Sequence, residues 1–398
     1  MINETYKNML SNKNIIRVLS EYATARKAEI GEENVFDFTL GNPSVPCAPS
    51  FTEGVIDMYN NLEPVSLHGY SPSLGIESVR ETLANALKKR FGVSYEAKHI
   101  FMTSGAAGAI AHAVRAVTKP GDKVITFAPY FPEYIPYVNT TGAELVVIPA
   151  DTEAFQINLK AFEEMLDDKV NAVLINSPNN PSGAVYSAET LKALSDMMRD
   201  AEKKYGHEIF LISDEPYREI VFDGGEVPYP ADFYDNSVSC YSFSKSLSLP
   251  GERIGYVAIN PKAKDADIFS AMCGQISRGI GHNCPASTAQ LGIERVLKDE
   301  WETSDLSIYE RNMNILYDAL TDMGFSIVRP GGTFYMFPKA LISDANEFCT
   351  RAKDFDLILV PSDNFGVDGY FRIAYCTDTE KVERSLDAFG KLAAVYKA

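Results

Sequence analysis

The sequence lacks an excess of positive charge. Its 398 residues include 37 Lys and Arg against 54 Asp and Glu, which gives a formal net charge of −17. A chain this acidic is a poor candidate for general binding to nucleic acid or to anionic membranes, because both of these partners are polyanions. The composition is instead consistent with a cytoplasmic enzyme that acts on small molecules.

The chain also lacks the marks of secretion, membrane insertion and metal binding. Its opening residues, MINETYKNMLSNKN, contain no apolar core of the kind found in signal peptides. No apolar run approaches the length of a membrane-spanning helix. The six cysteines include no CxxC pair, and the five histidines show no HExxH spacing. We therefore expect reduced thiols, no disulfide framework and no metal centre.

Short runs rich in valine and isoleucine alternate with helical patterns through the middle of the chain. Between two such runs, Ala188–Lys204 can place Leu191, Leu194 and Met198 on one helical face. Strands that alternate with helices predict an α/β fold with a largely parallel, doubly wound sheet, which binds ligands beyond the carboxyl ends of its strands. The expected strands are Lys123–Pro129, Glu144–Ala150, Ala172–Ser177, Ile209–Asp214, Val238–Phe243 and Gly255–Asn260.

The two ends of the chain have a different pattern. The first fifty residues predict a helix at Ile15–Glu29 and then an extended segment, DFTLGNPSVP. After Pro285 we expect a long helical stretch through Asp322 and a final helix at Glu380–Tyr396. Short strands are expected between them, at Ser326–Val328, Thr333–Phe337, Leu357–Val360 and Tyr370–Ala374. This pattern predicts a large domain at 51–289 and a smaller domain at 290–398, to which residues 1–50 contribute.

Polar residues follow one predicted strand in the segment YSFSKSLSLPGERIG, which contains Ser242, Ser244, Lys245 and Arg253. A lysine at a strand end can form a Schiff base when its surroundings lower its pKa. The two serines and the arginine can together hold a phosphate, with the guanidinium bound to two oxygens. A lone lysine in a loop is usually only a surface residue, but this lysine has these neighbours.

Three other segments allow a functional and a plain structural interpretation. NSPNNPSG, from Asn176 to Gly183, is also a typical turn sequence. Asp214 and Tyr217 lie in ISDEPYRE at a strand end, where acids are commonly solvated. In MTSGAAGAI, small residues at a helix start indicate either an anion site made by free backbone N–H groups or tight helix–sheet packing.

Taken together, these segments resemble the motifs of class I/II aminotransferases, the fold-type-I enzymes that use pyridoxal 5′-phosphate (PLP). The order of motifs matches over nearly the whole chain. The matching motifs are GNP, Tyr70 ahead of Gly75 and Arg80, the Gly-rich helix start, APYFPEY, NNPSG, SDEPY, SFSKSLSLPGERIG and FRIAY. The resemblance implies a large domain with a mostly parallel seven-stranded sheet flanked by helices, and a smaller α+β domain.

The resemblance also implies cofactor-binding roles. Lys245 matches the lysine that binds PLP as a Schiff base and carries the proton in catalysis. Asp214 matches the acid that keeps the pyridine nitrogen protonated, so that the ring is an electron sink. Asn180 and Tyr217 match the pair that hydrogen-bonds the 3′-oxygen, and Phe131 matches the aromatic residue stacked on the ring. The implied phosphate ligands are Gly105, Ala106, Ala107, Ser242, Ser244 and Arg253, with Tyr70 reaching the phosphate in the neighbouring subunit of a homodimer.

Substrate recognition follows from the same resemblance. Arg372 in YFRIAY matches the arginine that binds the substrate α-carboxylate, beside Asn180, and Gly41 lets the backbone approach that carboxylate. Arg278 lies five residues before Asn283, as does an arginine that one subgroup uses, from the partner chain, to bind the distal carboxylate of aspartate. Alternatively, Arg278 points to solvent or binds a neighbouring acid.

The sequence therefore predicts a PLP-dependent aminotransferase with ping-pong Schiff-base chemistry. The favoured substrates are an aspartate-like dicarboxylate and a 2-oxo acid such as 2-oxoglutarate. Two alternatives stay open: a transaminase for alanine or aromatic amino acids, and a C–S β-lyase on the same fold. A non-catalytic protein is not expected, because Lys245, Asp214, Arg253 and Arg372 are all present.

Overall fold

The computed structural model describes residues 1–398 except 1, 3, 11–14, 299–300 and 398. Its larger part is built on a seven-stranded sheet with the strand order β2-β8-β7-β6-β5-β3-β4. Strand β8 is antiparallel to β2 and β7, and the other neighbouring strands are parallel. The strands are β2 (Ile100–Thr103), β3 (Lys123–Phe127), β4 (Glu144–Ile148), β5 (Val170–Asn176), β6 (Phe210–Asp214), β7 (Ser237–Ser242) and β8 (Gly255–Ile259).

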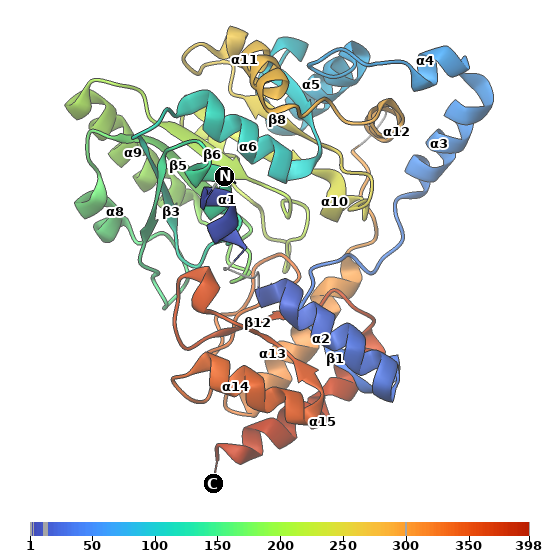
Figure 1. Ribbon diagram of the computed structural model, residues 1–398, viewed down its shortest axis with the longest axis vertical. Helices are drawn as coiled ribbons and strands as arrows, with labels where there is room; N and C mark the ends of the chain where they lie inside the picture. Colours follow the sequence, from blue (N-terminus) through green and yellow to red (C-terminus); the bar gives the residue numbers. More distant parts are fainter. Residues whose placement is uncertain (1, 3, 11–14, 299–300, 398) are drawn as a thin grey trace.

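Helices cover both faces of this sheet (Figure 1). Helices α6 and α11 pack on the face that Leu174 and Ile212 present, whereas α8 and α9 pack on the face of Val173 and Leu211. Successive strand residues thus enter different cores, as the alternation of a β-strand requires. The helices of this part are α3 (Pro49–Asn61), α4 (Pro64–His68), α5 (Glu77–Phe91), α6 (Gly105–Val117), α7 (Tyr134–Asn139), α8 (Leu159–Met165), α9 (Ala188–Tyr205), α10 (Phe243–Ser246), α11 (Ala266–Ile280) and α12 (Ser287–Leu297).

Helix α9 shows how the sequence determines an element. The side chain of Ser187 accepts a hydrogen bond from the N–H of Thr190 and so caps the start of the helix. Leu191, Leu194 and Met198 are buried, as their spacing predicts. Gly206 ends the helix in the left-handed conformation, with φ 76°.

The smaller part combines segments from both ends of the chain, and Figure 1 shows α2 beside the C-terminal elements. Strand β1 pairs in parallel with β10, and β11-β12-β9 form an antiparallel sheet. The elements are α1 (Glu4–Met9), α2 (Ile15–Ile30), β1 (Phe36–Asp37), α13 (Ser307–Asp322), β9 (Tyr335–Met336), α14 (Ala345–Ala352), β10 (Leu357–Ile358), β11 (Val360–Pro361), β12 (Phe371–Ala374) and α15 (Thr379–Val395). Short 3₁₀ helices lie at Glu32–Asn34, Ala97–His99, Pro230–Asp232, Lys353–Phe355 and Asp363–Phe365.

The α/β architecture and the seven-stranded sheet confirm the expected fold, whereas three local predictions need correction. Strand β2 was not predicted from the sequence. The expected strand at Ser326–Val328 is absent, because the segment makes one isolated backbone bond, from the N–H of Lys339 to the carbonyl of Ser326, and no ladder. The long helical stretch after Pro285 divides into α12 and α13. The expected domain boundaries stay a prediction.

Membrane insertion is a separate question from the fold. Within the described residues, no helix combines the length and the apolar character needed to cross a bilayer.

Candidate active site

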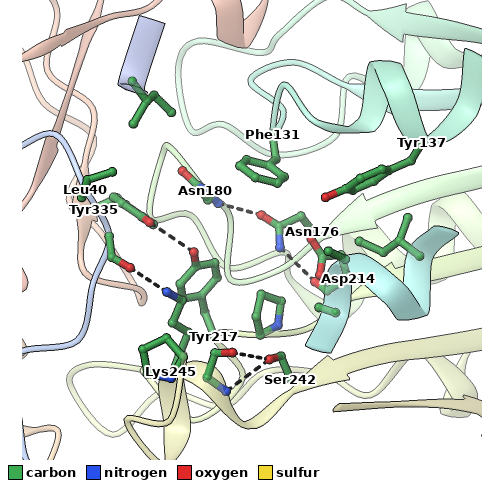
Figure 2. Close-up of a pocket in the computed structure, with 18 of the residues that line it drawn as sticks. Leu40, Phe131, Tyr137, Asn176, Asn180, Asp214, Tyr217, Ser242, Lys245 and Tyr335 are labelled. Carbon is green, nitrogen blue, oxygen red and sulfur yellow. Dashed lines mark hydrogen bonds between the residues drawn. The ribbon is translucent and has the colours of Figure 1, made fainter. Parts of the chain in front are cut away.

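Three parallel strands end side by side and bring their last residues to one cavity. Asn176, at the end of β5, is in register with Asp214 at the end of β6, and Ser242 ends the adjacent strand β7. The carboxyl ends of parallel strands are where α/β sheets bind ligands. The cavity has a volume of about 360 Å³. Figure 2 shows Phe131 and Tyr137 on one side of it and Lys245 and Ser242 on the other.

Most of the residues singled out from the sequence line this cavity. From the N-terminal segment comes Gly41, and from the C-terminal part comes Arg372, so both ends of the chain complete a site on the large sheet. The other predicted residues in the lining are Ala106, Ala107, Phe131, Asn180, Asp214, Tyr217, Ser242, Ser244, Lys245 and Arg253.

Lys245 lies on the short helix α10, directly after β7. Its Nζ donates a hydrogen bond to the backbone carbonyl of Gly41 at 2.6 Å and lies 5.5 Å from the centre of the Phe334 ring. Burial lowers the pKa of Lys245 to about 8, because an apolar enclosure disfavours the charged amine. A much larger fraction of this amine is therefore neutral and nucleophilic at neutral pH than for an exposed lysine.

Asp214 is buried at the end of β6, with one carboxylate oxygen bonded and the other free. The hydroxyl of Tyr134 donates to its Oδ2 at 2.6 Å. Its Oδ1 is buried and has no hydrogen-bond partner among the described residues. Burial raises the pKa of Asp214 to about 7, and the bond from Tyr134 opposes that rise. Such an orphaned oxygen is available to accept a hydrogen bond from a ligand N–H donor.

Arg372 is a buried guanidinium that is 2% exposed. Its Nη1 donates to Oδ1 of Asn180 at 3.1 Å, and its Nη2 donates to the carbonyl of Thr39. Its Nε has no partner among the described residues. Burial lowers the pKa of Arg372, and the groups that oppose this effect are Tyr335, Tyr217 and Cys376 rather than a carboxylate. A buried cation without an acidic partner is suited to bind an anionic ligand.

A second group of hydrogen-bond donors lies at the start of α6. Its first backbone N–H groups lack partners within the helix, and the side chain of Ser104 does not cap them. The Oγ atoms of Ser242 and Ser244 lie 2.7 Å apart. Arg253 bonds to Oγ of Ser244 at 3.4 Å and to the carbonyl of Ser104 at 3.1 Å. A Cβ added at Gly105, whose φ is 79°, would lie 2.8 Å from Nη2 of Arg253.

Gly41 is required by close packing around a pair of tyrosines. A Cβ added there would lie 1.7 Å from the hydroxyl of Tyr335, so an alanine cannot fit without moving that ring. The hydroxyls of Tyr335 and Tyr217 are 3.2 Å apart, and the guanidinium of Arg372 lies 4.6 Å from the centre of the Tyr335 ring. The structure therefore gives Gly41 a packing role in addition to the backbone approach expected from the sequence.

Sequence reasoning did not single out several residues of the site. Tyr137 and Tyr335 contribute phenol groups to the cavity lining, and Ile16 and Leu40 contribute apolar contacts from the N-terminal segment. Tyr134 does not line the cavity, but its hydroxyl donates to Asp214, which does. Two of these residues had a usable signal, because Tyr134 and Tyr137 follow Phe131 at intervals of three residues. That spacing is compatible with one face of a helical turn.

Three predicted residues do not line the cavity within the chain: Gly105, which lies against Arg253 beside it, and the more distant Tyr70 and Arg278. Tyr70 follows α4 and is fully exposed. Arg278 is exposed near the end of α11, where its Nη1 donates to Oε1 of Gln275 at 3.2 Å. The predicted roles of Tyr70 and Arg278 require a second copy of the chain, so both stay predictions.

The sequence of the chain matches a family model for aminotransferase class I and II over residues 33–389. Among curated relatives, an aspartate aminotransferase of Thermotoga maritima is 30% identical over 361 residues, with 89% of this chain and 90% of the relative covered. An aromatic-amino-acid aminotransferase of Thermococcus litoralis is 28% identical over 378 residues, with 91% and 92% covered.

Solved structures agree with the sequence match. An aminotransferase from Eubacterium rectale superimposes with a TM-score of 0.96 at 43% identity and covers 100% of both chains. An aspartate aminotransferase from Thermotoga maritima superimposes with a TM-score of 0.84 at 28% identity, covering 95% of this chain and 96% of that one. The likeness thus extends over the whole chain and includes both parts of the fold.

Proposed function

Because the chain belongs to the aminotransferase class I and II family, we propose that its cavity binds PLP and moves an amino group between an L-amino acid and a 2-oxo acid. The observation that carries this proposal is that three ionisable groups whose charged forms burial disfavours, none with a counter-ion among the described residues, meet in one cavity. These groups are the amine of Lys245, the free Oδ1 of Asp214 and the acid-free guanidinium of Arg372.

The residues of the site fit PLP group by group. The free Oδ1 of Asp214 is placed to accept a bond from a protonated pyridine nitrogen. The start of α6, with Ser242, Ser244 and Arg253, offers donors to a phosphate dianion. Phe131 supplies an apolar plane for the ring. When bound, PLP supplies an electron sink for the charge that develops at the substrate Cα.

The chain's own groups then divide the work on the substrate. Arg372 and Asn180 bind the α-carboxylate and orient the substrate, since a guanidinium matches both carboxylate oxygens. Lys245, as a neutral amine, would take the proton from Cα of the amino donor and pass it to the cofactor carbon that carries the transferred nitrogen. With the 2-oxo acid acceptor it would move a proton in the opposite direction, from that carbon to the new Cα. Tyr217 and Asn180 donate hydrogen bonds to the 3′-oxygen, and Asp214 keeps the ring nitrogen protonated through its charge.

The preferred substrate in this proposal is an aspartate-like dicarboxylate. The chain acts as a homodimer, in which Arg278 of one copy binds the distal carboxylate in the other copy's cavity and Tyr70 binds its phosphate. Curated relatives carry the names of both aspartate and aromatic-amino-acid aminotransferases, so their names support aminotransfer but not one donor. Transfer from alanine or aromatic donors and C–S bond cleavage are the alternatives that the experiment below separates.

The test is an absorption titration of the PLP-loaded protein without any 2-oxo acid acceptor. L-aspartate, L-alanine, L-tyrosine and L-cystathionine are added separately. We expect aspartate, at the lowest concentration, to convert the visible band of bound PLP into the band of pyridoxamine phosphate. Conversion only by alanine or tyrosine would contradict the aspartate preference. If the PLP band persists and pyruvate is released from cystathionine, the result would favour the C–S β-lyase over the aminotransferase.

A further inference from the structure

We propose that Tyr134 is a positioning residue, which fixes the carboxylate of Asp214 by binding one of its oxygens and so aims the other into the cavity. This inference rests on the proposed function, because it concerns the acid that faces the cofactor ring nitrogen. Its direct evidence is the bond from the Tyr134 hydroxyl to Oδ2 at 2.6 Å and the orphaned Oδ1 of the same carboxylate.

The position of Tyr134 is rigid. It is the first residue of α7, is 1% exposed and packs in the core between α6 and the sheet. Its ring contacts that of Phe131 edge to face, with centroids 5.8 Å apart. Figure 2 shows Phe131 facing the cavity above Asp214. One short segment after β3 thus supplies both this aromatic ring and, from Tyr134, a hydrogen-bond donor to the carboxylate of Asp214 at the end of β6.

The direction of the Tyr134–Asp214 bond is fixed by chemistry. Burial raises the pKa of Tyr134 well above its ordinary value, and the nearby Asp214, Tyr186 and Tyr217 raise it further. The phenol therefore stays protonated, and its hydroxyl remains the donor. Asn176 is bonded instead to the backbone carbonyl of Asp214, at 2.9 Å, so it does not orient the carboxylate oxygens.

The other titratable groups around Asp214 do not replace this donor. Glu215 faces away and is paired with Arg218 at 2.8 Å, and its charge raises the pKa of Asp214. Cys240 on β7 is buried with a pKa raised well above its ordinary value, so its thiol is neutral. Tyr134 thus donates the side-chain hydrogen bond that favours the ionised form of Asp214 in the described structure.

Loss of the hydroxyl is expected to have two consequences. Asp214 becomes more basic, so that a proton shared with the ring nitrogen moves toward the carboxylate and the ring loses part of its positive charge. The carboxylate is also free to turn, since neither oxygen then has a fixed partner. Both effects act on the chemical step and not on the α-carboxylate site at Arg372.

The test compares Tyr134→Phe with Tyr234→Phe as a matched control. Tyr234 is also buried, and its hydroxyl donates to the carbonyl of Ile209 at 2.8 Å, just before the start of the same strand β6. Each variant therefore removes one buried hydrogen bond, but only one of them touches Asp214. The probe is the carboxylic-acid stretch of Asp214 in infrared pH titrations of the full-length, PLP-free protein, identified by its loss in Asp214→Asn.

We expect Tyr134→Phe to move the Asp214 titration upward by about one pH unit, as the loss of a hydrogen bond to a charged group implies. Tyr234→Phe should leave the titration of the wild-type protein unchanged. In the PLP-loaded enzyme, Tyr134→Phe should lower kcat by about tenfold or more with KM nearly unchanged. An unshifted Asp214 titration in Tyr134→Phe would overturn the proposal.

A second variant covers the case in which Tyr134→Phe does not fold. Tyr134→3,5-difluorotyrosine keeps the ring and makes the hydroxyl a stronger donor, so it should move the Asp214 titration downward. The absence of that shift would likewise contradict the role of Tyr134. The titration needs neither PLP nor substrate, so its result is separate from that of the proposed function.

Discussion

At the scale of the residue, the site contains three ionisable groups whose charged forms are disfavoured by burial. Burial raises the pKa of Asp214 and lowers those of Lys245 and Arg372. In each case desolvation disfavours the ionised form, and no counter-ion within the described residues compensates it fully. Perturbed groups that meet in one cavity are typical of catalytic sites. The cavity therefore contains groups whose ionised forms a bound ligand of opposite charge would stabilise.

The lowered pKa of Lys245 predicts the pH dependence of PLP attachment. Since the pKa falls from 10.5 to about 8, the neutral amine predominates above about pH 8 and is lost as pH falls through that value. The rate of attachment to PLP-free protein should rise up to about pH 8 and then level off. Mass spectrometry after borohydride reduction measures this rate. A rate that keeps rising to pH 10 would contradict a lowered pKa of Lys245. As the control, Lys245→Ala should show no attachment of PLP and nearly no turnover.

At the scale of the element, the proposed phosphate site depends on the junction of α6 with strands β7 and β8. Gly255 opens β8 opposite Ser242, and a Cβ there would lie 2.2 Å from the carbonyl of Tyr241. Gly105 takes the left-handed conformation and lies against Arg253. The glycines thus let the helix start approach the strand ends closely enough to share one anion.

Gly105→Ala is expected to weaken this anion site. The added methyl group both strains a backbone with φ 79° and displaces the Arg253 guanidinium. We expect the affinity for PLP to fall by about tenfold, which corresponds to about 1.4 kcal/mol. The affinity for pyridoxal, which lacks the phosphate, should change little, and this comparison is the control. Equal losses for both ligands in equilibrium dialysis would place the damage outside the phosphate site.

Elements differ in how far the sequence predicts them. Strands β3 and β5 to β8 are largely buried on both faces, so they appear in the sequence as apolar runs, whereas the edge strand β4 is mostly half-buried but is still rich in valine and isoleucine. Strand β2 has four residues at the sheet edge, and its identity depends on pairing with the distant β8. The wrongly predicted strand at Ser326–Val328 is the opposite case. Its composition favours a strand, but in the structure no neighbouring strand pairs with it. Pairing is a tertiary property that local composition does not contain.

The same reason explains which site residues were found from the sequence. Lys245 and Arg253 lie in one segment, so their association is visible in the motif. Tyr134 binds an acid 80 residues away, and Tyr335 contacts Tyr217 across 118 residues. The spacing of Tyr134 from Phe131 indicates a shared face, but it does not indicate which distant residue Tyr134 contacts. The motif indicates the chemistry of the site, whereas the orientation of its groups depends on distant packing.

At the scale of the whole molecule, the cavity of one chain lacks two residues that the proposed function requires. Arg278 and Tyr70 are both exposed and lie outside it. Large apolar side chains are also exposed on the segment formed by α3, α4 and the following loop, which Figure 1 shows at the edge of the molecule; they are Ile56, Tyr59, Val65 and Tyr70. Exposed apolar clusters commonly mark interfaces. These features support the proposed homodimer.

Subunit mixing tests whether the two copies share their sites. Lys245→Ala removes the catalytic amine from its own cavity, whereas Arg278→Ala is proposed to impair the cavity of the other copy. Each variant alone should therefore be nearly inactive on aspartate, and Arg278→Ala should retain activity on alanine. After random exchange, half of the dimers are mixed and each has one intact site, so we expect about a quarter of the wild-type aspartate activity.

The matched control mixes Lys245→Ala with Arg372→Ala. Both of these residues line the cavity of their own chain, so a mixed dimer has one defect in each site and should gain no activity. Recovery with Arg278→Ala but not with Arg372→Ala would therefore show that Arg278 acts across the interface. If the two mixtures behave equally, Arg278 does not act in the neighbouring cavity. In that case the apolar contacts of Ile16 and Leu40 would favour the alanine or aromatic alternative over aspartate.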